Sequence, residues 1–114
     1  MEIKDIKFKA KALNSGEWVE GDLLHRITDT CIATKDMDDI VYYPVDPATV
    51  CQFTGLKDKN GTPIYEGDIV TDDVRKDAIN WNSKFSAFCF GNSSLYYFPS
   101  ENMVVVGNKF EKEV

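Results

Sequence analysis

Three cysteines and one histidine are the residues of this chain best suited to metal binding or nucleophilic catalysis. They are Cys31, Cys51, Cys89 and His25. Structural zinc sites usually bring their ligands in closely spaced pairs such as Cys-x-x-Cys, and the sequence has no such pair. A cysteine nucleophile needs a nearby base and a third group that orients the base, and these spacings predict neither. We therefore predict no catalytic residues, no metal site, no cofactor and no enzyme activity, and we expect buried, inert cysteines.

Aspartates gather in two segments, Asp36-Met37-Asp38-Asp39 and Asp72-Asp73. Their carboxylates are of the type that holds a divalent cation. Neither segment has the spacing of an EF-hand loop, with its glycine and its terminal glutamate. Because aspartate is common in turns, we interpret both segments as solvated turns.

An aromatic stretch near the C-terminal end is the candidate interaction surface. Apolar residues occupy both alternating faces of residues 85–98, so one face must be buried elsewhere, exposed, or used against another chain. Small β domains use aromatic surfaces to grip peptides or to stack bases. The candidate residues are Trp81, Phe85, Phe88, Tyr96 and Tyr97.

A stripe of lysines near the N-terminus is the alternative site. Its residues are Lys4, Lys7, Lys9 and Lys11. The whole chain has 19 acidic and 13 basic residues and a formal charge of −6, which disfavours contact with a phosphate backbone. The stripe predicts a nucleic-acid-binding module as the alternative function, although the total charge argues against a nucleic-acid partner.

Alternating apolar and polar residues predict a half-buried strand from Ile6 to Ala12, paired as a hairpin with Trp18 to Leu24. A second hairpin is predicted between Thr30 to Thr34 and Ile40 to Val45. Pro44 lacks a backbone donor and favours a sheet edge for the latter strand.

The middle of the chain carries the strongest turn signals. Asp46 to Thr49 predicts a capped helical turn, because Asp can accept from early amides and Pro suits the first helical position. Asn60-Gly61 predicts a hairpin between Gln52 to Lys57 and Thr62 to Tyr65. Gly67 then predicts a sharp corner, of the kind that closes small barrels.

The last third predicts a hairpin of Ile79 to Trp81 with Phe85 to Phe90, a strand at Leu95 to Phe98, and a final strand at Met103 to Val106. Short strands separated by turns at intervals of about eight to twelve residues favour an all-β fold, either a small β-barrel or meander, or a sandwich. Helix content should be low.

The length of 114 residues fits a single domain over residues 1–114, with possible sub-modules 1–50 and 51–114 that share one core. The first residues lack the apolar segment of a signal peptide, and no apolar run approaches the ~18 residues of a membrane span. An odd number of unpaired cysteines is typical of a reducing compartment. We therefore expect a cytoplasmic protein with no membrane association.

The segment from Val45 to Val70, VDPATVCQFTGLKDKNGTPIYEGDIV, closely resembles the central motif of the YopX family, small proteins encoded by bacteriophages and prophages. Ile6 to Ala10 followed by Trp18 to Leu23 is similar to the family's opening, and Val105 to Asn108 to its closing motif. Residues 71–102 match poorly. The chain departs from the usual Arg, Trp and Gly of the family at Lys9, Lys11 and Cys51, respectively.

The resemblance implies a β-rich fold whose later half is similar to an SH3-like barrel, a phage or prophage origin, and the cytoplasm of a bacterial host. It implies no activity, because the function of the family is uncharacterised. Our leading hypothesis is a non-enzymatic protein-interaction module that binds a host or phage protein, or a second copy of itself, through sheet edges or the aromatic stretch.

Overall fold

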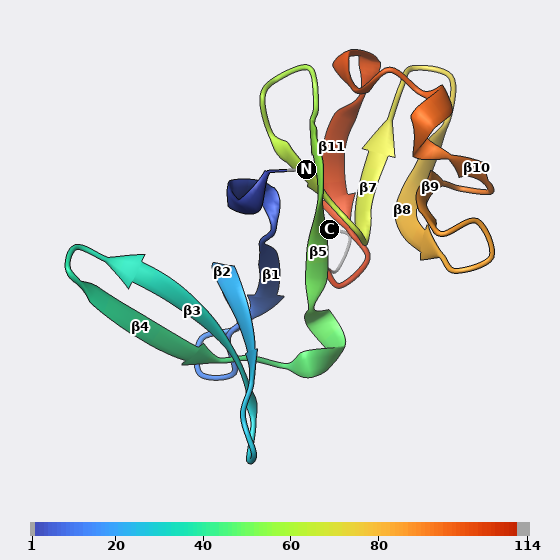
Figure 1. Cartoon of the computed structure of the whole chain (residues 1–114). Helices are drawn as coiled ribbons and strands as arrows, with labels where there is room; N and C mark the ends of the chain where they lie inside the picture. The colour runs from blue at the N-terminus through green and yellow to red at the C-terminus, as the bar shows by residue number, and fades with distance from the viewer. Residues whose placement is uncertain (1, 112–114) are drawn as a thin grey trace. The chain divides into compact units, whose positions relative to one another are not determined.

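The computed structural model describes residues 2–111, which form short antiparallel strands and four single turns of 3-10 helix (Figure 1). The predicted all-β class is therefore confirmed. The chain divides into two compact units, Met1–Phe53 and Thr54–Val114. A core shared by the two units stays a prediction.

Unit 1 contains a meander of four strands and the start of a fifth. In chain order its elements are η1 (Ile3–Asp5), β1 (Phe8–Lys11), β2 (Trp18–His25), β3 (Thr30–Asp36), β4 (Asp39–Pro44), η2 (Pro47–Thr49) and the beginning of β5 (Cys51–Lys57). The strand order is β4-β3-β2-β1-β5. Both predicted hairpins of this half are confirmed.

The alternation in the first strand buries one face and leaves the lysines on the other. Ala10 is fully buried and joins Ile32 and Val45 in the core of unit 1. The strand is shorter than predicted: it begins at Phe8, because Ile3–Asp5 forms a helical turn and Ile6 remains half exposed.

Strand β2 changes partners at Gly21. Its first half, up to Gly21, pairs with β1, and its second half, from Asp22, pairs with β3. A Cβ atom at Gly21 would collide with the carbonyl oxygen of Ala33. The glycine is therefore needed for a close approach of two backbones.

The predicted capped turn and the predicted edge strand are both present in unit 1. The carboxylate of Asp46 accepts a hydrogen bond from the Ala48 amide at 3.0 Å, and Pro47 opens η2. Strand β4, which ends at Pro44, is the outermost strand of the sheet.

Unit 2 contains the rest of β5 and a second sheet. Its other elements are β6 (Pro63–Tyr65), β7 (Asp68–Thr71), β8 (Lys76–Asn82), β9 (Ala87–Phe90), β10 (Ser93–Ser94), η3 (Leu95–Tyr97), η4 (Ser100–Asn102) and β11 (Val104–Asn108). Strand β6 pairs with β5, and the second sheet has the order β10-β9-β8-β7-β11. Gly67, with a φ of 89°, makes the predicted corner before β7.

The core of unit 2 is built from apolar residues of nearly every element. Its fully or almost fully buried members are Ile64, Val70, Ile79, Phe90, Leu95 and Met103. The Asn-Gly hairpin, the β8–β9 hairpin and the final strand are confirmed, although the last begins one residue later than predicted and continues through Asn108.

One expectation is wrong in detail, and another is not confirmed. Leu95 to Phe98 is not a strand, because Ser94 caps a helical turn there by accepting a hydrogen bond from the Tyr96 amide. No closed barrel forms among the described residues, and the SH3-like barrel expected in the later half is not seen.

Within residues 2–111, no helix is long and apolar enough to cross a membrane.

Candidate interaction surface

Trp81 and Phe88 form an aromatic pair on the hairpin of β8 and β9. They lie directly opposite each other in the ladder, and their rings meet edge to face with centroids 5.1 Å apart. Ile79 and Phe90, also paired, lie two residues further along the same face and are buried. The core-facing side of this hairpin thus continues into a half-exposed aromatic pair.

Phe85 projects from the turn of the same hairpin and is 56% exposed. The turn is held by Asn82, whose side-chain oxygen accepts hydrogen bonds from the amides of Lys84 and Phe85. Ser86 adopts a positive φ of 51°, which directs the chain back into β9. The polar turn therefore fixes an apolar side chain in solvent.

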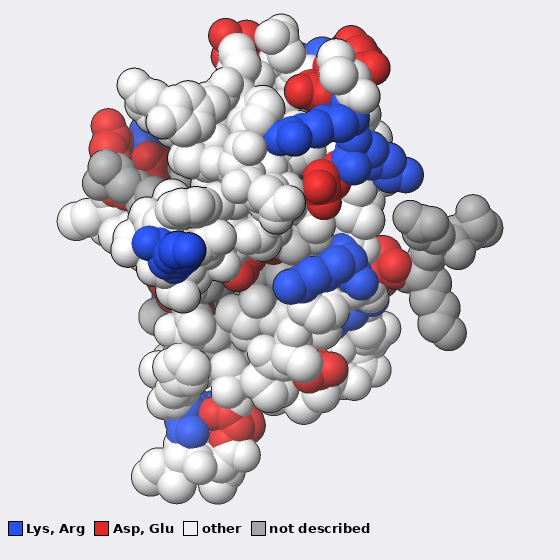
Figure 2. Space-filling view, turned by 90° about the vertical axis from the view of Figure 1, so that its right-hand side faces the viewer, with Lys and Arg blue, Asp and Glu red and all other residues white. Residues whose placement is uncertain are grey.

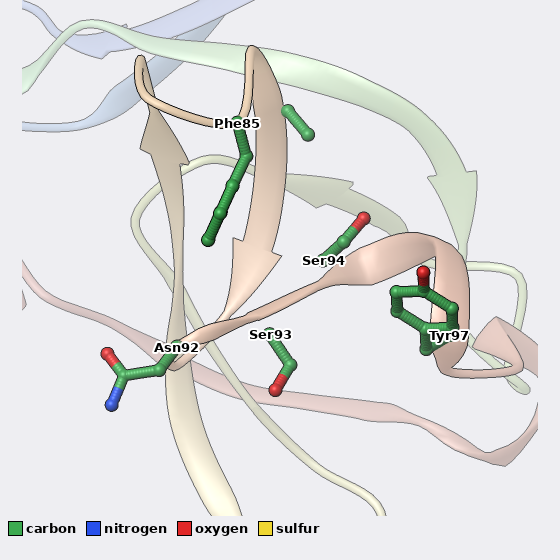
Figure 3. A pocket seen from close by; sticks show the side chains of 6 residues that line it. Phe85, Asn92, Ser93, Ser94 and Tyr97 are labelled. Carbon is green, nitrogen blue, oxygen red and sulfur yellow. The ribbon is translucent and has the colours of Figure 1, made fainter.

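Phe85 and Tyr97 meet at a cavity of about 370 Å³ (Figure 3). The full lining is Phe85, Ala87, Asn92, Ser93, Ser94 and Tyr97. Ala87 and Phe88 are neighbours in β9, so their side chains point to opposite faces of the hairpin. The cavity therefore lies on the face opposite to the Trp81–Phe88 pair. The two aromatic groups provide apolar walls, and the serine hydroxyls and the asparagine amide provide hydrogen-bonding groups.

The tyrosines of η3 are the most exposed aromatic residues of the candidate surface. Tyr96 is 88% and Tyr97 is 74% exposed, and their rings meet edge to face at 5.4 Å. The cap by Ser94 fixes the turn that presents them. Leu95, the first residue of that turn, is buried and anchors it to the core.

The structure therefore divides the five predicted residues into two groups. Phe85 and Tyr97 line the cavity, Tyr96 lies against Tyr97, and Trp81 and Phe88 form a separate pair. Sequence reasoning missed the polar lining of the cavity, which comes from Asn92, Ser93 and Ser94. The signal was a cluster of turn residues, which predicts a break in the strand pattern and says nothing of a cavity.

The lysine stripe lies beside aromatic and acidic side chains. The Lys7 ammonium is 3.2 Å from a carboxylate oxygen of Glu20 and 4.7 Å from the centre of the Phe53 ring. Lys9 and Lys11 lie over the ring of Trp18. Glu20 is also the direct ladder neighbour of Lys9, so an acidic side chain lies within the stripe.

The fourth lysine of the stripe, Lys4, forms an exposed ion pair with Glu2 at 3.4 Å. On the face that Figure 2 shows, basic side chains are interspersed with acidic ones and most of the surface is uncharged. Independently of that face, Glu2 and Glu20 form ion pairs with Lys4 and Lys7 and so reduce the positive field of the stripe.

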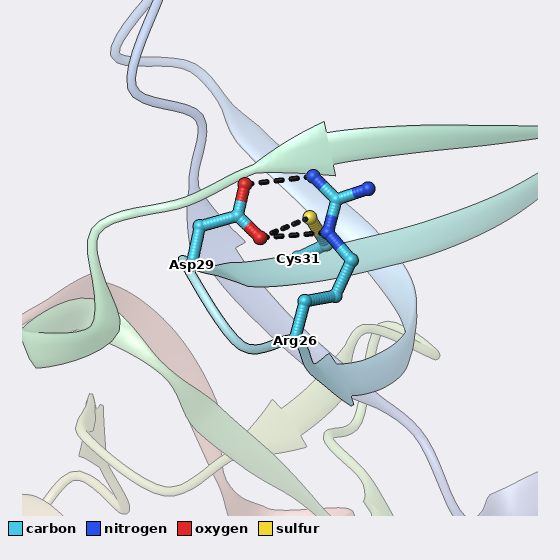
Figure 4. A network of polar contacts seen from close by, with 3 residues as sticks. All are labelled: Arg26, Asp29 and Cys31. Atoms are coloured by element: carbon cyan, nitrogen blue, oxygen red, sulfur yellow. Dashed lines mark hydrogen bonds and ion pairs between the residues drawn. The ribbon is translucent and has the colours of Figure 1, made fainter.

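The cysteines are all free and buried, whereas His25 is exposed at the end of β2. Arg26 donates two hydrogen bonds to the carboxylate of Asp29, at 2.6 and 2.7 Å, and the Cys31 thiol points at the same carboxylate (Figure 4). Burial raises the pKa of the Cys31 thiol, which disfavours the nucleophilic thiolate. Within residues 2–111, no three His, Cys, Asp or Glu residues are grouped so that they could hold a metal ion.

Asp58, in the central motif, is a buried carboxylate that holds the β5–β6 turn to the final strand. One oxygen accepts hydrogen bonds from the amides of Asn60 and Thr62, and the other accepts from Val105, each at 2.9 Å. Burial alone would raise the pKa of Asp58. The three amide donors lower the pKa by more than burial raises it, so the net pKa is below the usual value.

Asp68 and Asn108 connect the central motif to the closing motif. Asp68 is 1% exposed; one of its oxygens accepts from the Tyr65 amide at 2.7 Å and the other from the Asn108 side-chain amide at 2.9 Å. Asp46, Asp58 and Asp68 of the motif thus bind the protein's own backbone and side chains. The half-buried Asp72 behaves in the same way, since its carboxylate accepts hydrogen bonds from the amides of Val74 and Arg75.

The strand order defines an antiparallel all-β protein, and the chain divides into two small units. The sequence profile of one family, described as YopX protein, matches residues 6–113, so the chain belongs to the YopX family. A comparison with curated proteins finds no match to this chain.

Proposed function

We propose that this protein is a non-enzymatic interaction module of phage or prophage origin, which works in the cytoplasm of a bacterial host and binds a protein partner. The observation that carries the proposal is the cavity of unit 2, which has Phe85 and Tyr97 as walls and Tyr96 at its side. All three side chains are more than half exposed.

The energetics of aromatic side chains support a binding role for this surface. An aromatic residue covers roughly 150–250 Å² of surface when it is buried, and tyrosine is enriched among the residues that dominate protein interfaces. The capping of Ser94 and the turn hydrogen bonds of Asn82 hold the backbone that presents these side chains in place before binding. A preorganised surface loses less conformational entropy when a partner binds.

The lining of the cavity suggests what a partner would place in it. Within residues 2–111 the lining has no charged side chain, only two aromatic rings, one methyl group, the hydroxyls of Ser93, Ser94 and Tyr97, and one amide. Such a lining suits an apolar or aromatic side chain of a protein segment whose backbone can hydrogen-bond to Ser93 and Ser94.

Affinity capture from the bacterial host tests this proposal with matched variants. The double variant Phe85→Ser and Tyr97→Ser should recover the partner at least about tenfold less well, because truncating a central aromatic residue costs about 2 kcal/mol or more. The control is Val74→Ser, since Val74 is 90% exposed in the same unit and does not line this cavity. Equal recovery by both variants would refute the role of the cavity.

A nucleic-acid-binding module is the second candidate, favoured by one observation. Lys9 and Lys11 lie over the partly exposed ring of Trp18, so cationic and aromatic groups are combined on one face, as in proteins that bind single strands. Glu20 and the total charge of −6 oppose it. An electrophoretic shift at low salt, weakened steeply by added salt, would support this candidate, and no shift at low salt would eliminate it.

A further inference from the structure

Strand β4 has an unusually open outer edge. Among the described residues it pairs with β3 alone. The amide of Val45 donates to Thr30 at 2.9 Å, which is on the β3 side. Because backbone groups alternate along a strand, Val41 and Tyr43 also bond towards β3, whereas the N–H and C=O groups of Ile40 and Tyr42 point outward.

Both ends of this open edge are closed. Beyond Tyr42 the next outward carbonyl, that of Pro44, already accepts a hydrogen bond from the Leu13 amide at 2.9 Å. At the other end the chain reverses through a two-residue turn, with Asp36 paired to Asp39 across it. The free edge is therefore the short segment Asp39–Tyr43.

The side chains of this edge are apolar and exposed. Ile40 is 60% and Tyr42 is 48% exposed, and both lie on the same face of the strand. Leu24, on the same face two strands away, is 39% exposed. Proteins usually protect a sheet edge with charges, proline or a bulge, and here Asp39 and Pro44 lie only at its two ends.

We propose that a second copy of this chain pairs with the free edge of β4, antiparallel and about a two-fold axis at Val41. In that register Ile40 lies opposite Tyr42 of the partner subunit, and each such pair exchanges both of its backbone hydrogen bonds. The opposed side chains form aromatic–β-branched pairs, which are among the stabilising cross-strand combinations. The inference concerns unit 1 and is independent of the cavity of unit 2.

The length and symmetry of the edge favour a second copy over an unrelated strand. The free segment is bounded by the hairpin turn on one side and by the hydrogen bond from Leu13 on the other. In an antiparallel pair of two copies, the free segment of one copy has the same length as that of the other. The hairpin turn of each copy then begins where Leu13 already occupies the edge of the other copy. The outward N–H and C=O groups of Ile40 can bond to those of Tyr42 in the other copy, and the reverse, when a two-fold axis passes through Val41. An isologous interface requires this kind of self-complementarity.

Charge also selects the antiparallel arrangement. The turn of the hairpin carries Asp36, Asp38 and Asp39, all exposed. In the antiparallel arrangement the two copies of Asp39 lie four residues apart along the strands, or about 13 Å. This distance is longer than the Debye length at physiological salt, so the repulsion between the two carboxylates is largely screened. A parallel arrangement would bring the two acidic turns together and is disfavoured.

Sedimentation equilibrium of the full chain tests the proposal, from about 10 μM to about 1 mM, because so small an interface is expected to be weak. The unaltered chain should show a concentration-dependent dimer. Ile40→Lys should weaken dimerisation by about tenfold or more, since like charges then lie at the edge. Ile27→Lys is the matched control, because Ile27 is fully exposed in the same unit but outside β4, and it should leave the dimer unchanged.

A disulfide experiment keeps the proposal testable if Ile40→Lys fails to fold. Val41→Cys should form a covalent dimer on mild oxidation, because the two copies of residue 41 face each other at the axis. Met37→Cys is the control: Met37 is 89% exposed and would link faster in random collisions, but the register places the two copies of it far apart. A chain that stays monomeric at about 1 mM, or faster linking through Met37→Cys, would overturn the proposal.

Discussion

At the residue scale, the carboxylates of the central motif stabilise the fold of unit 2. The carboxylate of Asp58 accepts hydrogen bonds from three backbone amides, which belong to two segments far apart in the sequence. The carboxylate of Asp68 accepts one hydrogen bond from a backbone amide and one from the side-chain amide of Asn108. A buried carboxylate with several amide donors is held ionised and fixes the geometry of its donors. Within the segment from Val45 to Val70, these two carboxylates therefore have a structural role.

Substitution of Asp58 should destabilise the protein strongly. Asp58→Ala removes a charged acceptor and leaves the amides of Asn60, Thr62 and Val105 without it, at a cost of about 3 kcal/mol. Chemical denaturation monitored by tryptophan fluorescence measures the change. Asp38→Ala, at an exposed turn, should change the free energy of unfolding by less than about 0.5 kcal/mol, and equal effects of the two would contradict this role.

The same carboxylate predicts a loss of stability in acid. The folded-state pKa of Asp58 is lowered relative to the unfolded chain, so the group contributes stability above the unfolded pKa of about 3.9. That contribution is lost as the pH falls from about 4 through the folded-state pKa. Denaturation curves measured between about pH 7 and pH 3 should show a smaller decline for Asp58→Asn than for the unaltered chain. An identical decline in both would show that Asp58 is not the titrating group.

At the scale of elements, β2 joins two hairpins because Gly21 lets it pass close to β3. Pairing with β1 ends at Gly21 and pairing with β3 begins at Asp22. A side chain at this position would force the two backbones apart.

Gly21→Ala should therefore destabilise unit 1. The added methyl group meets the Ala33 carbonyl, a backbone atom that cannot move away as a side chain could, and overpacking of this kind costs about 1–3 kcal/mol. Gly107→Ala is the matched control, because the nearest atom to its added Cβ is 4.0 Å away. Thermal unfolding followed by circular dichroism measures both, and a tolerated Gly21→Ala would refute the close-approach argument.

Elements with a local cause were predictable from the sequence. The alternation around Ala10, the cap of Asp46 and the Asn60-Gly61 turn each act over a few residues, and each forms as predicted. The run from Leu95 to Phe98 has the composition of a strand, but the Ser94 cap and the burial of Leu95 select a helical turn. The Ser94 cap is a local signal of the same kind as the Asp46 cap and was open to prediction, whereas the burial of Leu95 depends on tertiary contacts that a pattern of residues does not encode.

At the scale of the whole molecule, the candidate site was predictable in its aromatic residues and not in its arrangement. Apolar residues occupy both alternating faces of residues 85–98, and one core cannot cover both faces. The exposure of Phe85 and of the two tyrosines therefore follows from the sequence. The separation of Trp81 from the cavity depends on strand register, and the polar lining depends on where β10 ends. Both are set by the packing of the second sheet.

Site-specific photo-crosslinking in the bacterial host shows whether the aromatic cavity of unit 2 is a protein-binding surface. A photoreactive amino acid replaces Tyr96, which is 88% exposed beside the cavity, or Val74, which is 90% exposed outside its lining. A protein-binding role of the cavity predicts one dominant covalent adduct with a host or phage protein from position 96 and none from position 74. No adduct from position 96, or the same adduct from both positions, would contradict it.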